Sequence, residues 1–363
     1  MLHIITALHT GGAEKMLAQL SWQQSEVYDL HVAVLKDINT LQDQFAPSTN
    51  FHFLGPQWSW QRQLQELYIR LQPFCIHTHL GHADLYGMRA AQGFHFGRVC
   101  SMHNEGFSHS WKNRLYQPLY RYALRRWAPT ALVVANSGSV QQHVVQVLGV
   151  PKERTFMLYN PLGAVAENPS FSNALDAVAP ARLGQHTLIF VGRLQREKGL
   201  DILIKALALL PLAHRPRLLV LGIGTLEAAY KAMAKSLGLE DHIVWFGYRQ
   251  NVHHYIGLAD ALVAPSRTEA FGNAVLEAFQ VGKPAIAAKT GGLRELVTDG
   301  TTGLHFLPED SEDLAAKIST LLADEDHRSA MGKAAKQVAD GWPSIRAYAT
   351  SLADVYAAAV AMQ

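Results

Sequence analysis

The chain contains 363 residues with a formal net charge of +2, and 48% of its residues are hydrophobic while 17% are charged. This balance is typical of a well-packed protein with room for two domains. It excludes a disordered chain and gives no global field that would favour nucleic acid. The two cysteines, Cys75 and Cys100, lie far apart in apolar runs. We therefore predict buried thiols in a reducing compartment, and neither a disulfide framework nor a zinc site.

The first residues, MLHIITALHTGG, have no basic leader and reach two glycines too early for a signal peptide. No run in the sequence approaches the ~20 apolar residues that a membrane span requires. Together these features predict a cytoplasmic protein.

In the first half of the chain, short apolar runs bounded by turn residues predict strands. They cover residues 2–8, 31–35, 75–80, 98–103 and 131–137. Between the first two runs lies AEKMLAQLSWQQ, in which Met16, Leu17 and Leu20 have helical spacing. A strand, a helix and a further strand in this order predict a parallel sheet with right-handed crossovers.

The second half repeats this pattern. Its predicted strands cover residues 186–192, 217–224, 242–247, 261–266 and 284–289. The stretch between the halves, residues 162–185, is rich in Ala, Pro, Asn and Ser and has no clear period, which is typical of a linker. The sequence thus predicts two doubly wound α/β domains that face each other across a cleft. We place them at residues 1–165 and 166–345, and expect a final helix at 346–363 to pack back on the first domain.

The first candidate site is the glycine pair in TALHTGGAEKML. Here a predicted strand runs into Gly11 and Gly12 and then into a helix, which places backbone N–H groups at the carboxyl edge of the sheet. Such an arrangement can bind an anion, although the GxGxxG pattern is absent. A tight turn without a ligand is an equally good interpretation.

The segment FVGRLQREKGLD offers two cations. A predicted strand ends at Gly192, and Arg193 and Lys198 then flank a loop that enters a helix. Two cations beside a helix N-terminus suit a diphosphate. The alternative is an exposed charged turn, because Arg196 and Glu197 share the same loop.

The segment RTEAFGNAVLEAF contains two acids, Glu269 and Glu277. We predict a helix that begins near Asn273 and ends before Gly282, so that one acid precedes it and the other lies in its first turns. The acids would then address different parts of a ligand. Backbone amides between them could donate to anionic or hydroxyl groups; these amides belong to Phe271, Gly272, Asn273 and Ala274. A metal site is disfavoured, because no Asp or His stands at chelating spacing.

Four segments together resemble glycosyltransferase family 4, whose members have the GT-B fold. They are GGAE, VGRLQREKG, TEAFGNAVLE with its Glu-x7-Glu spacing, and GKPAIAAKTGGLRELVTDGTTGL, and they span nearly the whole chain in the family's order. One departure is Ala270, where the family usually has glycine; this change bears on the donor sugar.

The resemblance implies a role for each matching residue. Glu269 and the adjacent amides would hold the donor sugar, and Glu277 would hold the ribose hydroxyls. Arg193 and Lys198 would neutralise the diphosphate, which Gly11 and Gly12 would approach from the other domain. The family also places a histidine at the position of His103, after a strand, where it hydrogen-bonds the donor sugar.

The resemblance further implies a retaining transfer of a hexose or N-acetylhexosamine from a nucleoside-diphosphate sugar, with UDP favoured over GDP. The acceptor would be a glycan or a lipid-linked molecule, in bacterial cell-surface polysaccharide or lipopolysaccharide synthesis. No metal or other cofactor is expected. The alternatives are a GT-B-like sugar-nucleotide epimerase and a non-catalytic nucleotide-sugar-binding protein. A Rossmann-type dehydrogenase is disfavoured, because GxGxxG with its downstream acid is missing.

Two other patterns could indicate a metal. His77 and His79 lie on one side of a predicted strand, but no carboxylate or thiol completes a ligand set, so we favour structural histidines. The acidic string at 324–326 lies in a polar helical stretch far from the other motifs, so we favour a solvated face.

The segment WKNRLYQPLYRYALRRW, residues 111–127, mixes basic and aromatic residues and contains no acid. This composition suits the surface of an anionic membrane or a lipid-linked acceptor, which would make the protein peripheral on the inner face of the cell membrane. A half-buried helix with a packed aromatic side is the equally weighted alternative.

Overall fold

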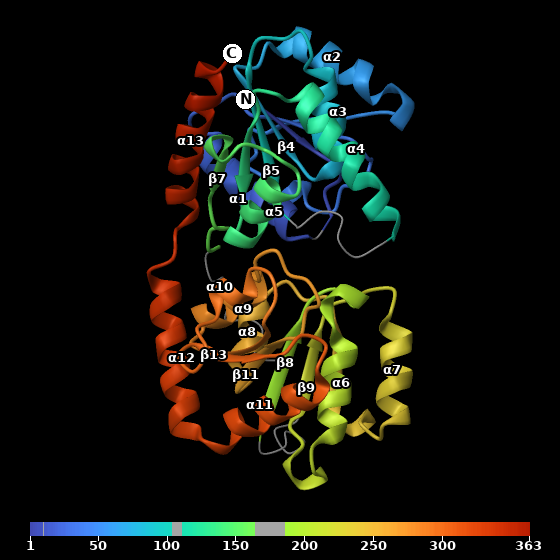
Figure 1. Ribbon diagram of the computed structural model, residues 1–363, viewed down its shortest axis with the longest axis vertical. Coiled ribbons are helices and arrows are strands. Elements are labelled where there is room, and N and C mark those ends of the chain that lie inside the picture. The colour runs from blue at the N-terminus through green and yellow to red at the C-terminus, as the bar shows by residue number, and fades with distance from the viewer. Residues whose placement is uncertain (10, 104–110, 164–185) are drawn as a thin grey trace. The chain divides into compact units, whose positions relative to one another are not determined.

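The computed structural model describes residues 1–9, 11–103, 111–163 and 186–363 (Figure 1). Contacts divide them into two compact units. The first unit consists of Met1–Gly163 together with Pro343–Gln363, and the second ends at Trp342. The chain therefore leaves the first unit and later returns to it. Where it returns, the backbone N–H of Leu162 donates to the carbonyl of Pro343 at 3.2 Å.

The first unit is built on a seven-stranded parallel sheet in the order β3-β2-β1-β4-β5-β6-β7. Its strands are β1 (Leu2–Ile5), β2 (His31–Val34), β3 (Asn50–Phe53), β4 (Cys75–His79), β5 (Gly97–Met102), β6 (Leu132–Ala135) and β7 (Thr155–Met157). The strand order reverses at β1 and β4, where His3 pairs with His77. In α/β sheets this is the point at which ligands bind, outside the carboxyl ends of the strands.

The helices of the first unit are α1 (Gly12–Gln24), α2 (Trp60–Leu71), α3 (Gly81–Ala90), α4 (Trp111–Trp127), α5 (Gly138–Gln146) and α13 (Ile345–Ala361). Short 3-10 turns are η1 (Gln42–Gln44), η2 (Gln57–Ser59) and η3 (Lys152–Arg154).

Helices α1 and α13 cover one face of the first sheet and share a buried core with β1, β4 and β5. α13 packs there because its apolar residues recur at helical spacing; the buried ones are Tyr348, Leu352, Val355, Tyr356 and Ala359. α3 lies on the opposite face, where its Gly87 approaches the side chains of Ile4 and Thr78.

The second unit has a six-stranded parallel sheet in the order β10-β9-β8-β11-β12-β13. Its strands are β8 (Thr187–Val191), β9 (Arg217–Leu221), β10 (Ile243–Gly247), β11 (Ala261–Ala264), β12 (Ala285–Ala288) and β13 (Gly303–Phe306). The order reverses between β8 and β11, so these two strands place their following loops side by side at the carboxyl edge.

The helices of the second unit are α6 (Leu200–Leu209), α7 (Glu227–Ser236), α8 (Val252–Gly257), α9 (Asn273–Gln280), α10 (Leu293–Leu296), α11 (Ser311–Ala323) and α12 (Glu325–Asp340). The 3-10 turns are η6 (Arg196–Lys198), η7 (Leu212–His214) and η8 (Glu240–His242). One large core joins α6, α7 and α11 to the sheet, and its members include Leu203, Val220 and Ile286. α12 packs against α9.

All ten predicted strands are present, most of them shorter than expected, and the two parallel-sheet α/β units are confirmed. Three strands, β3, β7 and β13, were not predicted. β3 consists of half-exposed or exposed residues, and β7 and β13 have only three and four residues.

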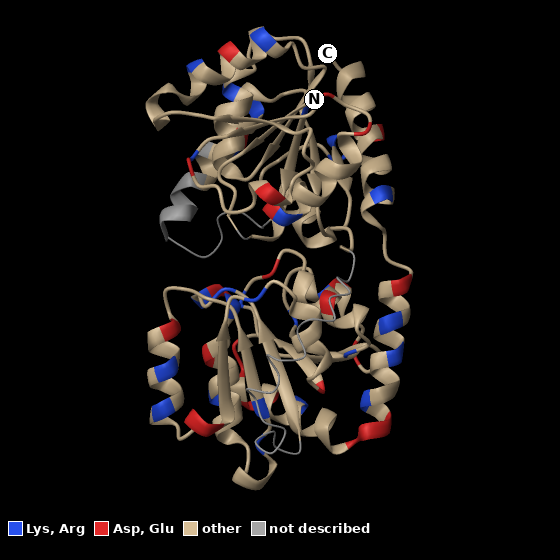
Figure 2. Ribbon diagram, turned by 180° about the vertical axis from the view of Figure 1, so that it is seen from behind, with Lys and Arg blue, Asp and Glu red and all other residues tan. Residues whose placement is uncertain are grey.

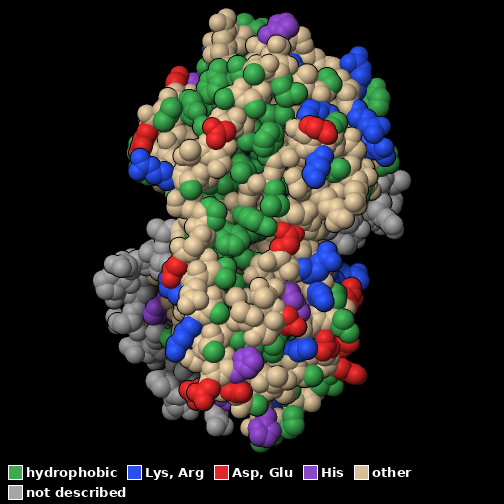
Figure 3. Space-filling view, turned by 60° about the vertical axis from the view of Figure 1, so that its left-hand side comes forward, with side chains coloured by type: hydrophobic (Ala, Val, Ile, Leu, Met, Phe, Trp, Pro, Cys, Tyr) green, Lys and Arg blue, Asp and Glu red, His purple; other side chains and the backbone are tan. Residues whose placement is uncertain are grey.

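Most of the predicted linker, residues 164–185, lies outside the described residues. On the surface shown in Figure 3, both acidic and basic side chains occur on each of the two units.

Candidate functional site

Arg193 and Lys198 lie on the connection from β8 to α6, but their surroundings differ. The side chain of Arg193 is 64% exposed, and its guanidinium lies 3.2 Å from Oε1 of Glu197. The side chain of Lys198 is only 21% exposed. Figure 2 shows Lys and Arg on the loops at this edge of the second sheet. The side chain of Arg193 is therefore mostly exposed to solvent, whereas that of Lys198 is largely buried.

Lys198 is held by Glu269, which follows β11. The ammonium Nζ of Lys198 lies 2.6 Å from Oε2 of Glu269, whose side chain is 18% exposed. The hydroxyl of Ser266 donates to the same carboxylate oxygen at 3.0 Å. A charge-assisted hydrogen bond of this length is among the stronger polar contacts in proteins. The structure thus joins two residues that the sequence assigned to separate parts of the donor.

Arg267 fixes the two loops that carry this pair. Its guanidinium forms two parallel hydrogen bonds to the carboxylate of Asp201, at 2.8 and 2.7 Å. Its backbone N–H donates to the carbonyl of Glu197 at 2.8 Å. The hydrogen bonds that Arg267 donates to Asp201 raise the pKa of Arg267. Burial alone would raise the pKa of Asp201, but the hydrogen bonds and charge of Arg267 outweigh it and lower that pKa. Neither Arg267 nor Asp201 was predicted from the sequence as part of the site. The sequence feature that could have indicated Arg267 is its position two residues before Glu269.

Helix α9 begins as predicted, after Glu269. Gly272 precedes its first residue with a φ of +111°, a value that side chains other than glycine rarely adopt. The N–H groups of Val275 and Leu276 donate to the carbonyl of Gly272 at 2.9 and 3.2 Å. Asn273 and Ala274 form the first turn, and Phe271 is buried. Glu277 lies in the second turn and is partly exposed, so one acid precedes the helix and the other lies within it.

The glycine pair Gly291–Gly292 supports the loop of Glu269. The N–H of Gly292 donates to the carbonyl of Glu269 at 2.8 Å. A Cβ at Gly292 would collide with the backbone of Ala270 and Phe271. The close approach of these two loops therefore requires glycine at this position.

In the first unit, Gly11 and Gly12 begin α1 as predicted. Gly11 is the N-cap residue and has an extended backbone. A Cβ at Gly11 would collide with the carboxylate of Glu14, which is 8% exposed. A negative side chain therefore already lies at this helix N-terminus, where it is favoured by the helix dipole. Glu14 was not recognised from the sequence, and Thr10 lies outside the described residues.

A cluster of buried histidines lies beneath α1 and α13. Each of His3, His77 and His79 offers a ring nitrogen, and these nitrogens lie within 4.8 Å of one another. Both nitrogens of His77 already have partners, the Tyr356 hydroxyl at 2.8 Å and the Ser101 hydroxyl at 2.7 Å. The arrangement satisfies these rings without an ion, which favours the structural role over a metal site.

His103 follows β5 at its carboxyl end. Its Nε2 lies 3.4 Å from Nδ1 of His79, and the two rings are stacked. Burial lowers the pKa of His103 to about 4, so the imidazole is neutral at pH 7. Its Nδ1 is buried and has no hydrogen-bond partner among the described residues, which stop here and resume at residue 111.

The acidic string at 324–326 lies on an exposed helix start. Asp324 caps α12, and its carboxylate accepts a hydrogen bond from the N–H of His327 at 2.9 Å.

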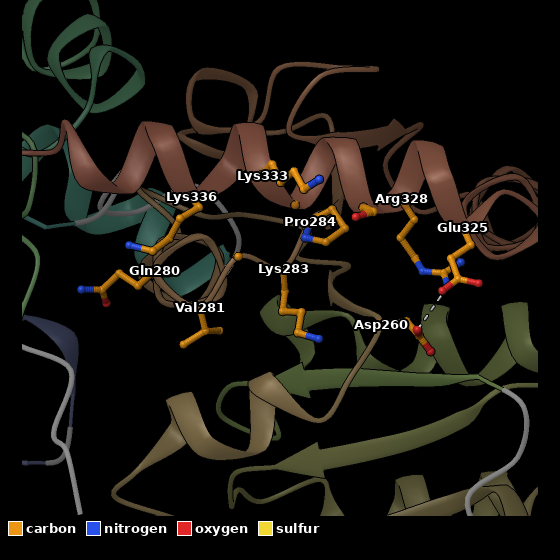
Figure 4. Close-up of a pocket in the computed structure, with 12 residues that line it drawn as sticks. Asp260, Gln280, Val281, Lys283, Pro284, Glu325, Arg328, Lys333 and Lys336 are labelled. Atoms are coloured by element: carbon orange, nitrogen blue, oxygen red, sulfur yellow. Dashed lines mark ion pairs between the residues drawn. The ribbon is translucent and has the colours of Figure 1, made fainter.

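A pocket of about 610 Å³ lies nearby, between α12 and the loops that precede β11 and β12 (Figure 4). Asp260 and Arg328, which line it, form an ion pair at 3.4 Å. Because the pocket lies at the amino ends of these strands, it is separate from the site at their carboxyl ends.

Helix α4 has one anchored side and one exposed side. The hydroxyl of Tyr120 donates to the buried Asp84 at 2.6 Å, and Trp127 lies under the guanidinium of Arg89. Three arginines, Arg121, Arg125 and Arg126, are exposed. The side chains at 111–116 and 119 lie outside the described residues. Among the helices that the structure describes, none combines the length and apolar character needed to cross a membrane.

Two family models match the chain. One, described as Glycosyltransferase Family 4, matches residues 10–162, and the other, Glycosyl transferases group 1, matches residues 172–338. A D-inositol 3-phosphate glycosyltransferase of Streptosporangium roseum is 32% identical over 243 residues, which is 63% of this chain and 55% of that protein. The chain spans about half the length of the curated relatives it matches.

Solved structures share the fold over nearly the whole chain. HepE of Anabaena, solved in complex with UDP-glucose, has a TM-score of 0.85 at 22% identity and covers 98% of this chain and 99% of its own. A sucrose-phosphate synthase of Thermosynechococcus elongatus has a TM-score of 0.82 at 20% identity, with 98% of both chains covered. At these identities the comparison establishes the fold of the two units.

Proposed function

The chain belongs to glycosyltransferase family 4 and has the GT-B fold, and we propose that it transfers a sugar from a nucleoside-diphosphate sugar with retention of the anomeric configuration. The observation that carries this proposal is the Lys198–Glu269 pair at the strand-order reversal between β8 and β11. A cation and a hydroxyl-binding acid are thereby fixed where α/β sheets bind ligands.

The cations act on the leaving group. As the bond between sugar and diphosphate breaks, negative charge grows on the phosphate oxygens, and preorganised cations stabilise that charge. Lys198 is held in place by Glu269, whereas Arg193 is exposed and paired with Glu197. We propose that both contact the diphosphate, and that Gly11 and Gly12 allow the backbone to approach it closely.

The acids bind hydroxyl groups. Glu269 accepts hydrogen bonds from the sugar hydroxyls, and the amides at the start of α9, from Phe271 to Ala274, donate to the same sugar. Glu277, in the second turn, accepts from the ribose hydroxyls. His103 contacts the donor sugar. This division is the one that the family resemblance implies, and it is compatible with the structure, in which one acid precedes the helix and the other lies within it.

Retention follows a front-face path in this proposal. Double displacement would need a carboxylate as nucleophile beneath the anomeric carbon, and both acids of the Glu-x7-Glu segment are engaged with hydroxyl groups. The departing phosphate oxygen instead takes the proton of the acceptor on the face where the bond broke. His103 remains a sugar contact, so His103→Ala slows the reaction without changing the anomer.

The favoured donor is a UDP-activated hexose or N-acetylhexosamine. Support comes from the structural similarity to HepE, which was solved with UDP-glucose. The proposed acceptor is a glycan or a lipid-linked molecule of bacterial surface polysaccharide or lipopolysaccharide synthesis. No divalent metal is required in this proposal, since two side-chain cations balance the leaving group. EDTA treatment followed by magnesium or manganese addition tests that point, because lost and restored activity would contradict it.

The deciding experiment is a screen of UDP- and GDP-sugars for slow hydrolysis, with detection of both products. Release of the nucleoside diphosphate identifies a transferase, and proton NMR of the first-formed sugar gives its anomer. An inverted product would contradict the retaining mechanism. A new sugar nucleotide without release of diphosphate would instead identify an epimerase, and binding without turnover would identify a sensor.

A further inference from the structure

A single chain of hydrogen bonds runs through the core of the first unit to His103. It starts at Gln24 on α1, passes through His3 on β1 and His79 at the end of β4, and reaches the residue that follows β5. The successive separations are 2.7 Å from Gln24 Oε1 to His3 Nε2, 2.9 Å from His3 Nδ1 to His79 Nε2, and 3.4 Å from His79 Nδ1 to His103 Nε2. Gln24, His3 and His79 are all buried.

The three rings in this chain are neutral at pH 7. Burial lowers the pKa of His3 to about 3 and that of His103 to about 4, and it lowers the pKa of His79 well below its ordinary value. A neutral imidazole has one N–H donor and one bare acceptor nitrogen. His3 and His79 must each donate to one neighbour and accept from the other. The direction of the hydrogen bond at one end of the chain therefore determines the tautomer of every ring, including His103.

The amide of Gln24 sets that direction. Its Nε2 donates to the hydroxyl of Tyr356 at 3.0 Å, and its Oε1 faces His3. The amide oxygen can only accept, so Nε2 of His3 carries the proton and Nδ1 of His3 is bare. It follows that His79 donates from Nε2 to His3 and accepts at Nδ1. His103 then donates from Nε2, and its Nδ1 is bare.

A second branch of the network agrees with this orientation of the amide. The hydroxyl of Tyr356 has one proton, and it accepts from Gln24. It can therefore donate to Nδ1 of His77 at 2.8 Å, and Nε2 of His77 donates onward to Ser101 at 2.7 Å. Apart from Nδ1 of His103, each hydrogen-bonding atom named in the two branches then has a partner of the correct kind. His77 belongs to the same cluster but is not part of the chain that reaches His103.

We propose that Gln24, His3 and His79 are positioning residues that hold His103 as the neutral Nε2–H tautomer, with the lone pair of Nδ1 available to accept a hydrogen bond from a hydroxyl group of the donor sugar. The proposal rests on the proposed contact between His103 and the sugar. Its structural support is the buried Nδ1, which has no hydrogen-bond partner among the residues that the structure describes.

This tautomer restricts the donor class. A bare nitrogen accepts a hydrogen bond, so it favours a sugar with a free hydroxyl at the contacted position. A deoxy-sugar leaves the nitrogen without a partner, and a hexuronate places a carboxylate against a lone pair. A site built to bind a hydroxyl discriminates strongly against analogues that lack it. The donor is therefore a hydroxyl-bearing neutral sugar at this position.

The same chain argues against a metal at these histidines. An ion between His3 and His79 would need a bare nitrogen from each ring on the shared side. In the hydrogen-bonded chain one of these two nitrogens carries the proton that joins them. Metal binding and the hydrogen-bonded chain are thus mutually exclusive. A measurement of which ring nitrogens of His3 and His79 carry protons distinguishes the two arrangements.

The first test is nitrogen NMR of the ligand-free protein with isotope-labelled histidine, in which the His103 signals are assigned by their loss in His103→Gln. The expected result at pH 7 is a protonated Nε2 and a bare Nδ1 for His103. A proton on Nδ1, a charged ring, or displacement of the His3 and His79 protons by added zinc would each overturn the proposal. This measurement needs no activity, so it is independent of whether the protein proves to be a transferase.

The second test compares two deletions of the same ring from the same cluster. His3→Leu breaks the chain two rings away from His103, whereas His77→Leu leaves the chain intact and serves as the matched control. We expect His3→Leu to shift the His103 tautomer and to lower kcat/KM for the sugar donor about tenfold or more, as for other partners that orient a histidine. The affinity for the bare nucleoside diphosphate should stay unchanged. Equal losses in both variants would show a general packing effect and would refute the positioning role.

Gln24→Met provides a further variant if His3→Leu does not fold. It keeps the bulk of the side chain but removes the amide that sets the direction, so the two tautomers of His103 are expected to coexist. An unchanged tautomer in Gln24→Met would refute the assignment of direction to this amide.

Discussion

The ammonium of Lys198 and the carboxylate of Glu269 lie 2.6 Å apart, although the two residues are 71 positions apart in the chain. Each holds the other in place before any donor binds. A diphosphate that contacts Lys198 must share this cation with Glu269, so the proposed leaving-group and sugar contacts are coupled.

The coupling predicts non-additive kinetics. Lys198→Ala should lower turnover on the order of 10²-fold or more, because a preorganised cation at the leaving group is lost. Glu269→Ala should also lower turnover, and the double variant should lose much less than the product of the two effects. Steady-state kinetics of the three variants measure this. Arg196→Ala is the matched control, since its exposed side chain lies on the same turn; independent, multiplicative losses would argue against the coupling.

Nucleotide binding should separate the two acids. Glu277→Ala should weaken binding of the bare nucleoside diphosphate by ~1.5–3 kcal/mol, since the ribose hydroxyls lose a charged acceptor. Glu269→Ala should bind the same nucleotide at least as tightly as the wild type, because Lys198 is released from its partner. Calorimetry with UDP and GDP gives both values. Similar losses in both variants would contradict the division of roles.

The buried Asp84 predicts a stability loss at rising pH. Burial raises its pKa from 3.8 to about 7, and it accepts hydrogen bonds from Thr78 and Tyr120. The folded state thus binds the proton more tightly than the unfolded chain. The stabilisation is complete below about pH 4 and is lost as the pH rises through 7. Urea unfolding of the wild type and Asp84→Asn at several pH values should show this slope only in the wild type. Parallel curves would mean that Asp84 has an ordinary pKa.

The buried histidines change the free energy of unfolding with pH in the opposite direction to Asp84. Burial depresses the pKa values of His3 and His103 to about 3 and about 4, below the ordinary value of 6.5. The unfolded chain therefore takes up protons first, and their contribution, present above pH 6.5, is lost as the pH falls towards 4. Burial also lowers the pKa of His77 well below its ordinary value, so His77→Gln should show a shallower acid limb in the unfolding curve. An acid limb as steep as that of the wild type would contradict this assignment.

Helix α4 gives a test for peripheral membrane association. Replacing Arg121, Arg125 and Arg126 by Gln should reduce cosedimentation with anionic liposomes. The binding free energy should weaken by about 1 kcal/mol for each of these residues that contacts the surface. The binding of the wild type should fade with added salt. The control replaces Lys231 and Lys235 on α7, where they are also solvent-accessible. If the wild type and the arginine variant sediment alike, the exposed side of α4 does not contact the membrane.

The sequence predicted the strands that carry the site, because buried strands give clear apolar runs bounded by glycine or polar residues. It also placed Lys198 and Glu269 each after a strand. Their contact could not be predicted, because it depends on β8 and β11 being neighbours in a sheet whose order reverses there. The edge strand β3 was missed for a related reason, since its half-exposed residues lack an apolar pattern.

The histidine cluster shows the same limit. His77 and His79 could be placed on one side of a strand from their spacing alone. His3 joins them only because β1 and β4 pair with His3 opposite His77. Glu14 was overlooked because an acid in the first turn of a helix is common, and only the geometry shows it filling the space beside Gly11.

The return of the chain to the first unit has a consequence for synthesis on the ribosome. α13 supplies Tyr348, Leu352 and Tyr356 to the core of a unit whose strands are made first. Tyr356 also completes the hydrogen bonds of His77 and Gln24. During translation, the first unit must therefore wait with a partly uncovered sheet face and unsatisfied polar groups until the second unit has emerged. Helix α13, which is made after the second unit, completes the core of the first unit.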